Sequence, residues 1–182
     1  VDLAGDLLMA ACGDRGLILL DPGTVWSPSP LAAVPHDLGV ATEGFVVRGD
    51  WGWLRQENGG FQVIDLRDPA LPVPGVVITP PSPVNDLELV GGALYAATTT
   101  GLRVYGLDDP ANPVDYGERP FDWSAESIGV KGTTVYVIDS RGIIRIFDVS
   151  NPLAPLEVDS ILTSFDPPFH LVCSGDDPSR RA

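Results

Sequence analysis

One phrase of about thirteen residues occurs three times in this chain at a nearly constant interval. The copies span residues 61–73, 102–114 and 144–156, and each contains an Asp-Pro or Asn-Pro step with a second proline three residues later. The first prolines of the copies are Pro69, Pro110 and Pro152, so the intervals are 41 and 42 residues. A period in this range is typical of repeat architectures, in which each repeat is one supersecondary unit. The repeat therefore constrains the fold more than any other feature of the sequence.

The best preserved repeat contains four short segments with strand character. They span residues 127–132, 133–138, 143–149 and 156–162, and they are rich in β-branched and aromatic residues. Glycine, proline and Asp-Ser-Arg-Gly turn chemistry separate them, as expected for tight connections. No segment shows capped 3.6-residue periodicity, so we predict an all-β chain. Four-stranded units of about forty residues indicate the blades of a β-propeller.

The repeat divides the chain into four approximate blades and one remainder. We predict a single β-propeller, or a fragment of one, over residues 1–182, with repeats at 1–39, 40–83, 84–124 and 125–166. The first repeat is the least regular of the four. Residues 167–182 begin a further blade or close the ring, and both alternatives stay open. Only in a closed four-bladed ring could Cys12 and Cys173 meet.

Two copies of the phrase resemble a known repeat. They read Gly-Leu-Arg-Val-Tyr-Gly-Leu-Asp-Asp-Pro-Ala-Asn-Pro-Val at 101–114 and Ile-Arg-Ile-Phe-Asp-Val-Ser-Asn-Pro-Leu-Ala-Pro at 144–155, and they are similar to the LVIVD repeat. This repeat is found in bacterial and archaeal propeller proteins, which are largely secreted or located at the cell surface. The resemblance implies a propeller and an extracytoplasmic location, and it implies no defined reaction. Gly106 departs from the pattern, because the other copies have Asp21, Asp65 and Asp148 at this position.

The charge of the chain excludes some classes of partner. The net charge is −14, so a nucleic acid backbone or an anionic membrane surface would be repelled. No apolar stretch is long enough to span a bilayer, and no signal peptide is recognisable in the given chain. Two cysteines do not make a disulfide framework, and no Cys/His cluster indicates zinc.

The repeated acidic and proline residues have a structural and a functional interpretation. An Asp or Asn before proline starts a turn through its own side chain, and this role is favoured over a proline-rich docking motif. Asp65 and Asp148 end apolar strands, and a ring of such carboxylates could hold Ca²⁺. We favour a role in fixing turns, because Gly106 would interrupt the ring.

No catalytic signature occurs in the sequence. The nucleophile elbow, the HExxH zinc motif, the P-loop and the Rossmann fingerprint are all missing, and His36 and His170 lie far apart in the sequence. We therefore predict a protein that is not an enzyme, without catalytic, cofactor-binding or metal-binding residues; Ca²⁺ is the one cofactor left open.

The segments between repeats carry aromatic residues that could bind a partner. Exposed aromatic residues on loops often anchor protein interfaces, whereas the alternative is that they fill the space between neighbouring blades. The candidate partner-binding residues are Phe121, Trp123, Phe165, Phe169 and His170. We predict a non-catalytic interaction or scaffold propeller of the cell surface or periplasm, whose partner is another protein or the remaining blades of a larger assembly. The alternative is an enzyme or a metal-binding or ligand-binding propeller with a site at the central channel.

Overall fold

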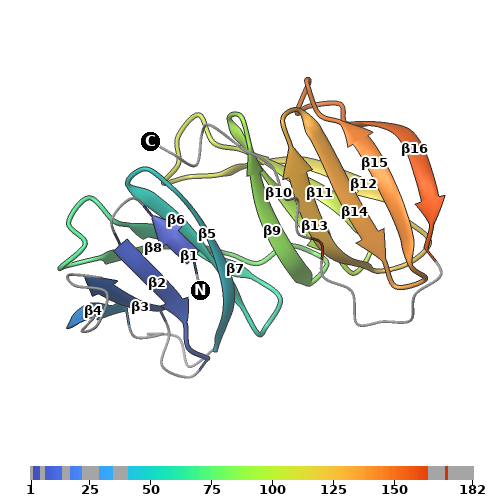
Figure 1. Cartoon of the computed structure of the whole chain (residues 1–182). Helices are drawn as coiled ribbons and strands as arrows, with labels where there is room; N and C mark the ends of the chain where they lie inside the picture. Colours follow the sequence, from blue (N-terminus) through green and yellow to red (C-terminus); the bar gives the residue numbers. More distant parts are fainter. Residues whose placement is uncertain are drawn as a thin grey trace. The chain divides into compact units, whose positions relative to one another are not determined.

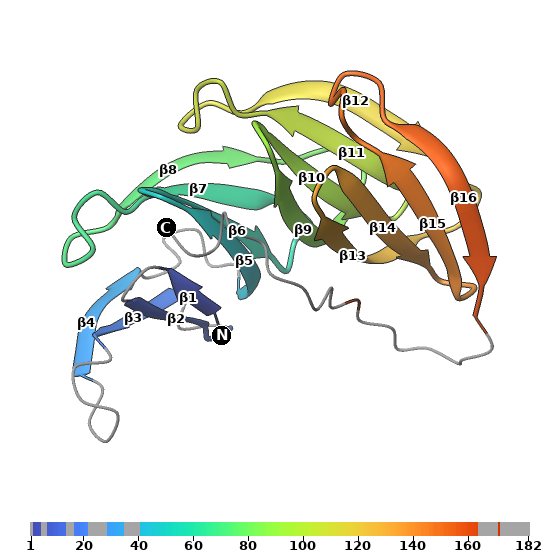
Figure 2. The same ribbon diagram turned by 45° about the horizontal axis from the view of Figure 1, so that its top comes forward.

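The structure is a computed structural model that describes residues 2–4, 7–13, 17–21, 29–34, 41–163 and 171. These residues form four antiparallel sheets of four strands each, and no helix occurs among them. In every sheet the strands lie side by side in chain order, so each sheet is a meander (Figures 1 and 2). The prediction of an all-β chain with four-stranded units is confirmed.

Residues 1–80 form one compact unit that contains the first two sheets. The first sheet consists of β1 (Asp2–Ala4), β2 (Leu7–Ala11), β3 (Leu17–Asp21) and β4 (Ser29–Val34). The second sheet consists of β5 (Thr42–Arg48), β6 (Trp51–Gln56), β7 (Phe61–Asp65) and β8 (Val73–Ile78). The core between the two sheets is made by the buried side chains of Met9, Leu17, Leu19, Leu54, Ile64 and Leu66.

Residues 81–181 form the other compact unit, with the third and fourth sheets. The third sheet consists of β9 (Val84–Val90), β10 (Ala93–Thr98), β11 (Gly101–Gly106) and β12 (Val114–Pro120). The fourth sheet consists of β13 (Ala125–Lys131), β14 (Thr134–Asp139), β15 (Ile143–Asp148) and β16 (Leu156–Leu162). The two sheets pack face to face around a core of eleven buried residues, which includes Tyr95, Leu102, Val137 and Phe147.

The turns repeat as regularly as the strands. The first hairpin turn of the second, third and fourth sheets contains Gly49, Gly91 and Gly132, with φ of 56°, 53° and 61°. Glycine adopts this left-handed conformation without the steric cost that a Cβ atom imposes. The same backbone conformation at the same place in three sheets shows that the repeat extends to the turns.

The Asp-Pro and Asn-Pro steps also form one type of turn. Oδ1 of Asp68, Asp109 and Asn151 accepts the backbone N–H two residues later, at 3.0, 3.0 and 3.1 Å. Each of these turns lies between the third and fourth strands of its sheet. The predicted role of the motif in starting a turn is therefore confirmed for all three copies.

Gly106 interrupts the acidic pattern for a reason that lies in the tertiary structure. A Cβ atom built on Gly106 would lie 2.0 Å from Oη and 2.1 Å from Cζ of Tyr116. The tyrosine ring of β12 therefore occupies the space that a side chain at position 106 would need.

Candidate interaction surface around Trp123

Two of the candidate partner-binding residues lie in the described part of the chain. Phe121 and Trp123 belong to the link between β12 and β13, which joins the third sheet to the fourth. Phe165, Phe169 and His170 lie outside the described residues. Phe121 and Trp123 lie two positions apart in this link, and their surroundings differ.

Phe121 packs against the core of its unit. Its ring is stacked on that of Phe147, with ring centroids 5.8 Å apart and an angle of 17° between the planes. The guanidinium carbon of Arg145 lies 4.7 Å from the centroid of the Phe121 ring. The backbone N–H of Phe121 donates to the carbonyl oxygen of Thr100 at 2.8 Å. These contacts give Phe121 the packing role that the sequence left as an alternative.

Trp123 points in contrast toward solvent. Trp123 is 47% exposed as a residue, and the guanidinium carbon of Arg141 lies 5.0 Å from the centroid of the indole. Arg141 is itself exposed, in the turn between β14 and β15. An arginine above an indole face is a cation–π pair, and its geometry keeps both side chains extended over the same surface. We call Trp123 and Arg141 the Trp–Arg pair.

The turn that carries Arg141 is held by a buried carboxylate. Asp139 is fully buried, and its Oδ1 accepts the backbone N–H groups of Arg141 and Ile143, both at 3.0 Å. The N–H of Ser140 donates to the carbonyl oxygen of Ser124 at 2.8 Å, which ties the turn to the link that carries Trp123. The Trp–Arg pair is therefore mounted on two segments that are hydrogen-bonded to each other.

Charged side chains continue from this turn across the fourth sheet. Oδ2 of Asp139 lies 3.6 Å from Nε of Arg145, and Nη1 of Arg145 lies 3.2 Å from Oε1 of Glu157. Arg145 thus lies between two carboxylates while its guanidinium covers Phe121. An arginine so placed fixes strands β14, β15 and β16 against the link.

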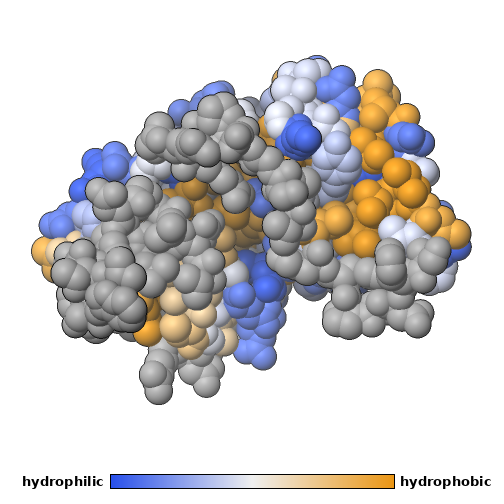
Figure 3. All heavy atoms as spheres, in the orientation of Figure 1, coloured by the Kyte–Doolittle hydropathy of each residue, from blue (hydrophilic) through white to orange (hydrophobic). Residues whose placement is uncertain are grey.

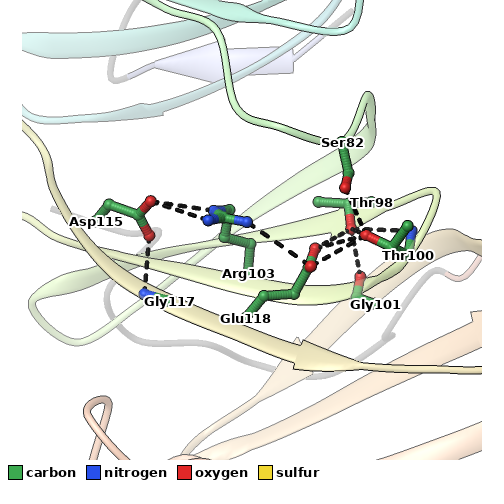
Figure 4. Close-up of polar contacts among 8 residues, drawn as sticks. All are labelled: Ser82, Thr98, Thr100, Gly101, Arg103, Asp115, Gly117 and Glu118. Carbon is green, nitrogen blue, oxygen red and sulfur yellow. Dashed lines mark hydrogen bonds and ion pairs between the residues drawn. The ribbon is translucent and has the colours of Figure 1, made fainter.

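The third sheet has a polar network at the corresponding place (Figure 4). Glu118 accepts hydrogen bonds from Oγ1 of Thr98 at 2.6 Å and from Oγ1 of Thr100 at 3.0 Å. The hydroxyl of Thr100 also lies 2.6 Å from that of Ser82. Nη1 of Arg103 lies 3.7 Å from Oε2 of the same glutamate. These contacts join β10, β11 and β12, so we assign the network to the pairing of the three strands.

The acidic strand ends bind their own turns. Oδ1 of Asp65 accepts the N–H of Arg67 at 3.0 Å, and Oδ1 of Asp148 accepts the N–H of Ser150 at 2.9 Å. The hydrogen bond from the Arg67 side chain lowers the pKa of Asp65, and the backbone N–H of Ser150 lowers the pKa of Asp148. Within the described residues, no three His, Cys, Asp or Glu side chains gather as a metal site would require. The turn-fixing role predicted for both residues is thus observed.

Sequence reasoning found Trp123 and missed its partner. Arg141 lies eighteen positions further along the chain, in a turn that was recognised only as a turn. The signal that could have pointed to it is the Asp-Ser-Arg-Gly sequence at 139–142, because an aspartate that starts a turn fixes the direction of the residues after it.

Comparison with known proteins agrees with this architecture. The sequence profile of the LVIVD repeat, a repeat of β-propellers, matches residues 124–163. The match covers the fourth sheet, which is thus similar to an LVIVD repeat. No curated protein sequence matches the chain significantly.

Three solved structures share the fold. The β-propeller domain of Cps50 (Swd1) from Myceliophteria thermophila has a TM-score of 0.69 at 15% identity, over 87% of this chain and 56% of that domain. The computationally designed protein Ika8 has a TM-score of 0.71 at 11% identity, over 96% of this chain and 52% of Ika8. The periplasmic gluconolactonase PpgL of Pseudomonas aeruginosa has a TM-score of 0.70 at 16% identity, over 86% and 51%.

The chain is thus built of β-propeller blades, and it spans about half the length of the solved structures that it matches. We refer to the four sheets as blades 1 to 4 from here on. No helix in the described part of the chain is long and apolar enough to cross a membrane.

Proposed function

We propose that this chain is a non-catalytic propeller that binds a protein partner, as an interaction or scaffold module of the cell surface or periplasm. The observation that carries the proposal is the Trp–Arg pair beside blade 4, in which Trp123 is 47% exposed and an exposed guanidinium lies over its indole. Tryptophan and arginine are among the residues most enriched where protein interfaces concentrate their binding energy.

The backbone around the pair supports this role. The packing of Phe121 and the hydrogen bond from Ser140 to Ser124 fix both segments that carry the pair. A surface that is already ordered loses less conformational entropy when a partner binds. The pair is therefore a better binding surface than a tryptophan on a free loop would be.

The charge of the chain sets the chemistry of the partner. A net charge of −14 favours a partner with a basic surface, which would be attracted faster at low ionic strength. The extracytoplasmic location rests on the LVIVD resemblance, since the repeat is found largely in secreted and cell-surface proteins.

Site-specific cross-linking tests the proposal directly. A photoreactive amino acid at position 123 should capture a defined protein in cells that express the chain, whereas the same residue at position 71, where Leu71 is 72% exposed, should not. With that protein purified, Trp123→Ala and Arg141→Ala should each weaken binding about 10-fold or more. Unchanged affinity in both variants, with the fold intact by circular dichroism, would remove the site. Phe121 is unsuited to this test because its replacement would disturb the core.

The alternative is an enzyme or a metal-binding or ligand-binding propeller with a site at the central channel. The similarity to the fold of a gluconolactonase favours it, although function resides in particular sites and not in the fold. Elemental analysis of dialysed protein tests the metal-dependent form of this alternative. A metal bound in stoichiometric amount would favour it over the interaction role.

A further inference from the structure

The turn between β6 and β7 is a tight hairpin loop closed by backbone hydrogen bonds. The N–H of Gly59 donates to the carbonyl oxygen of Gln56, and the N–H of Gln56 donates to that of Gly60, both at 2.9 Å. Gly59 has a φ of 81°, a left-handed conformation that glycine adopts without steric cost and that is typical of three-residue hairpin loops. Glu57 and Asn58 therefore form the tip of the turn.

The tip of this turn is polar and open to solvent. Apolar side chains gather over blade 4 (Figure 3), whereas Glu57 and Asn58 at the tip are both exposed. Oδ1 of Asn58 accepts the N–H of Gly60 at 3.1 Å, so the side chain is folded back over its own backbone. A hydrogen bond to a carbonyl oxygen withdraws electron density from its carbon. Cγ of Asn58 is therefore more open to attack by a nucleophile, and water reaches it freely.

The residue after Asn58 carries a nucleophile at the right separation. A bond between the backbone nitrogen of Gly59 and Cγ of Asn58 closes a five-membered ring, because only the carbonyl carbon, Cα and Cβ of Asn58 lie between the two atoms. Glycine has no Cβ atom that would hinder the approach. The Asn58–Gly59 step thus has the two groups that a ring closure needs.

The reaction that follows consumes only water. Hydroxide removes the proton of the Gly59 nitrogen, the nitrogen forms a bond to Cγ of Asn58, and the bond from Cγ to Nδ2 breaks. Nδ2 takes a proton from water and leaves as ammonia, which produces a cyclic imide. Water then opens the imide by breaking either bond of the ring nitrogen to a carbonyl carbon. Cleavage at Cγ gives aspartate at position 58, and cleavage at the main-chain carbonyl gives isoaspartate.

The three other asparagines of the chain lack this arrangement. Asn112 and Asn151 both precede proline, whose nitrogen has no proton to lose. Nδ2 of Asn85 donates to the carbonyl oxygen of Ala125 at 2.7 Å and to Oγ of Ser124 at 3.1 Å, so the next blade holds this amide. The structure therefore singles out Asn58 among the four.

We propose that Asn58 is a site of spontaneous covalent modification, at which the side-chain amide is hydrolysed through a cyclic imide formed with Gly59. The product carries one more negative charge, beside Glu57, and its isoaspartate form opens the turn. The co-reactant is water. This modification lies in blade 2 and does not depend on the binding role proposed for the Trp–Arg pair.

The two products affect the turn differently. A carboxylate oxygen of aspartate accepts the N–H of Gly60 as Oδ1 of Asn58 does, so this product keeps the turn. Isoaspartate adds one carbon atom to the main chain between Gln56 and Gly60. The two hydrogen bonds that close the turn then lose their spacing. Only the isoaspartate form should therefore be less stable than the parent chain.

The turn also sets the rate of the reaction. The N–H of Gly59 that must lose its proton is bonded to the carbonyl oxygen of Gln56 at 2.9 Å. This bond must open before the nitrogen can attack. The folded chain should therefore react more slowly than the chain unfolded in urea, and it should still react.

Peptide mapping by mass spectrometry tests the proposal on the 182-residue chain kept at mildly alkaline pH. Trypsin places the four asparagines in four different peptides, and Asn58 lies in the peptide of residues 56–67. This peptide should be replaced by two acidic products, of which an isoaspartyl methyltransferase labels one. The peptides of Asn85, Asn112 and Asn151 are internal controls and should stay unchanged. Asn58→Gln is the matched variant, because it keeps an amide whose ring closure would need six members, and it should not convert.

Urea unfolding of the aged protein tests the effect on the turn. Asn58→Asp should be as stable as the parent, whereas aged parent protein rich in isoaspartate should unfold at a lower urea concentration. Any of four results would overturn the proposal. They are a folded chain whose peptide 56–67 stays intact after the unfolded chain has reacted, an Asn85 that reacts as fast as Asn58, an Asn58→Gln variant that converts like the parent, and aged protein of unchanged stability.

Discussion

Gly106 is the position at which the repeat and the tertiary structure conflict, and Gly106→Asp tests the reason. The substitution restores the aspartate of the other copies, but its Cβ would lie 2.0 Å from Oη of Tyr116. The tyrosine must leave its place beside the core, against which it packs. If about 100 Å² of its surface returns to water at about 25 cal/mol/Å², the loss is about 2.5 kcal/mol. We therefore expect Gly106→Asp to lower the free energy of unfolding by about 1.5–3 kcal/mol.

Urea unfolding followed by circular dichroism measures this loss, and a double-variant cycle isolates its cause. In a Tyr116→Ala background the aspartate meets no ring, and its carboxylate is free to accept the N–H of residue 108, as Asp65 and Asp148 do in their turns. There Gly106→Asp should cost less than about 0.5 kcal/mol, a coupling of at least about 1 kcal/mol. An equal cost in both backgrounds would refute the reasoning, because Tyr116 would then not be the obstacle.

Three further predictions concern blades 3 and 4. Gly101→Ala places a methyl group 2.1 Å from the carbonyl oxygen of Arg119, so it should lower the free energy of unfolding in urea by about 1–3 kcal/mol. Gly92→Ala is the control, because the space around Gly92 is open, and it should lower the free energy of unfolding by less than about 1 kcal/mol. Phe121→Ala should lower stability by about 2–4 kcal/mol through lost packing on Phe147, and a loss below 1 kcal/mol would contradict the stacked geometry. Burial raises the pKa of Tyr95 and of Tyr105 to about 12 each, whereas both residues ionise near pH 10 in the unfolded chain. The contribution of the two buried tyrosines to stability should therefore be complete below pH 10 and fall between pH 10 and 12. Unfolding at alkaline pH measures this loss, and tyrosine absorbance follows the ionisation. Ionisation of both residues near pH 10 in the folded chain would contradict that burial.

The strand pattern and the turns were predictable because their causes are local. Alternating β-branched and aromatic residues between glycine and proline predict strands wherever they occur, and an Asp or Asn before proline binds its own backbone two residues later. The turns at Asp68, Asp109 and Asn151 show this, since each hydrogen bond spans only two residues. No tertiary contact was needed to infer them.

The candidate surface was only half predictable. An aromatic residue in a link between blades can bind a partner or fill the core, and the local sequence of Phe121 and Trp123 does not distinguish the two. The distinction depends on Phe147 and Arg141, which lie 26 and 18 positions further along the chain. Their contacts are decided by how blade 4 folds over the link.

By itself, the sequence determined that this chain repeats every 41 to 42 residues as a four-stranded antiparallel unit, because a period and a strand pattern are properties of the linear chain. The tertiary structure alone decided which residues of each unit are covered. Tyr95 and Tyr136 occupy the same position in blades 3 and 4, yet one is fully buried and the other partly exposed. The physical reason is that burial depends on the neighbouring blade, which the sequence of a single repeat does not contain.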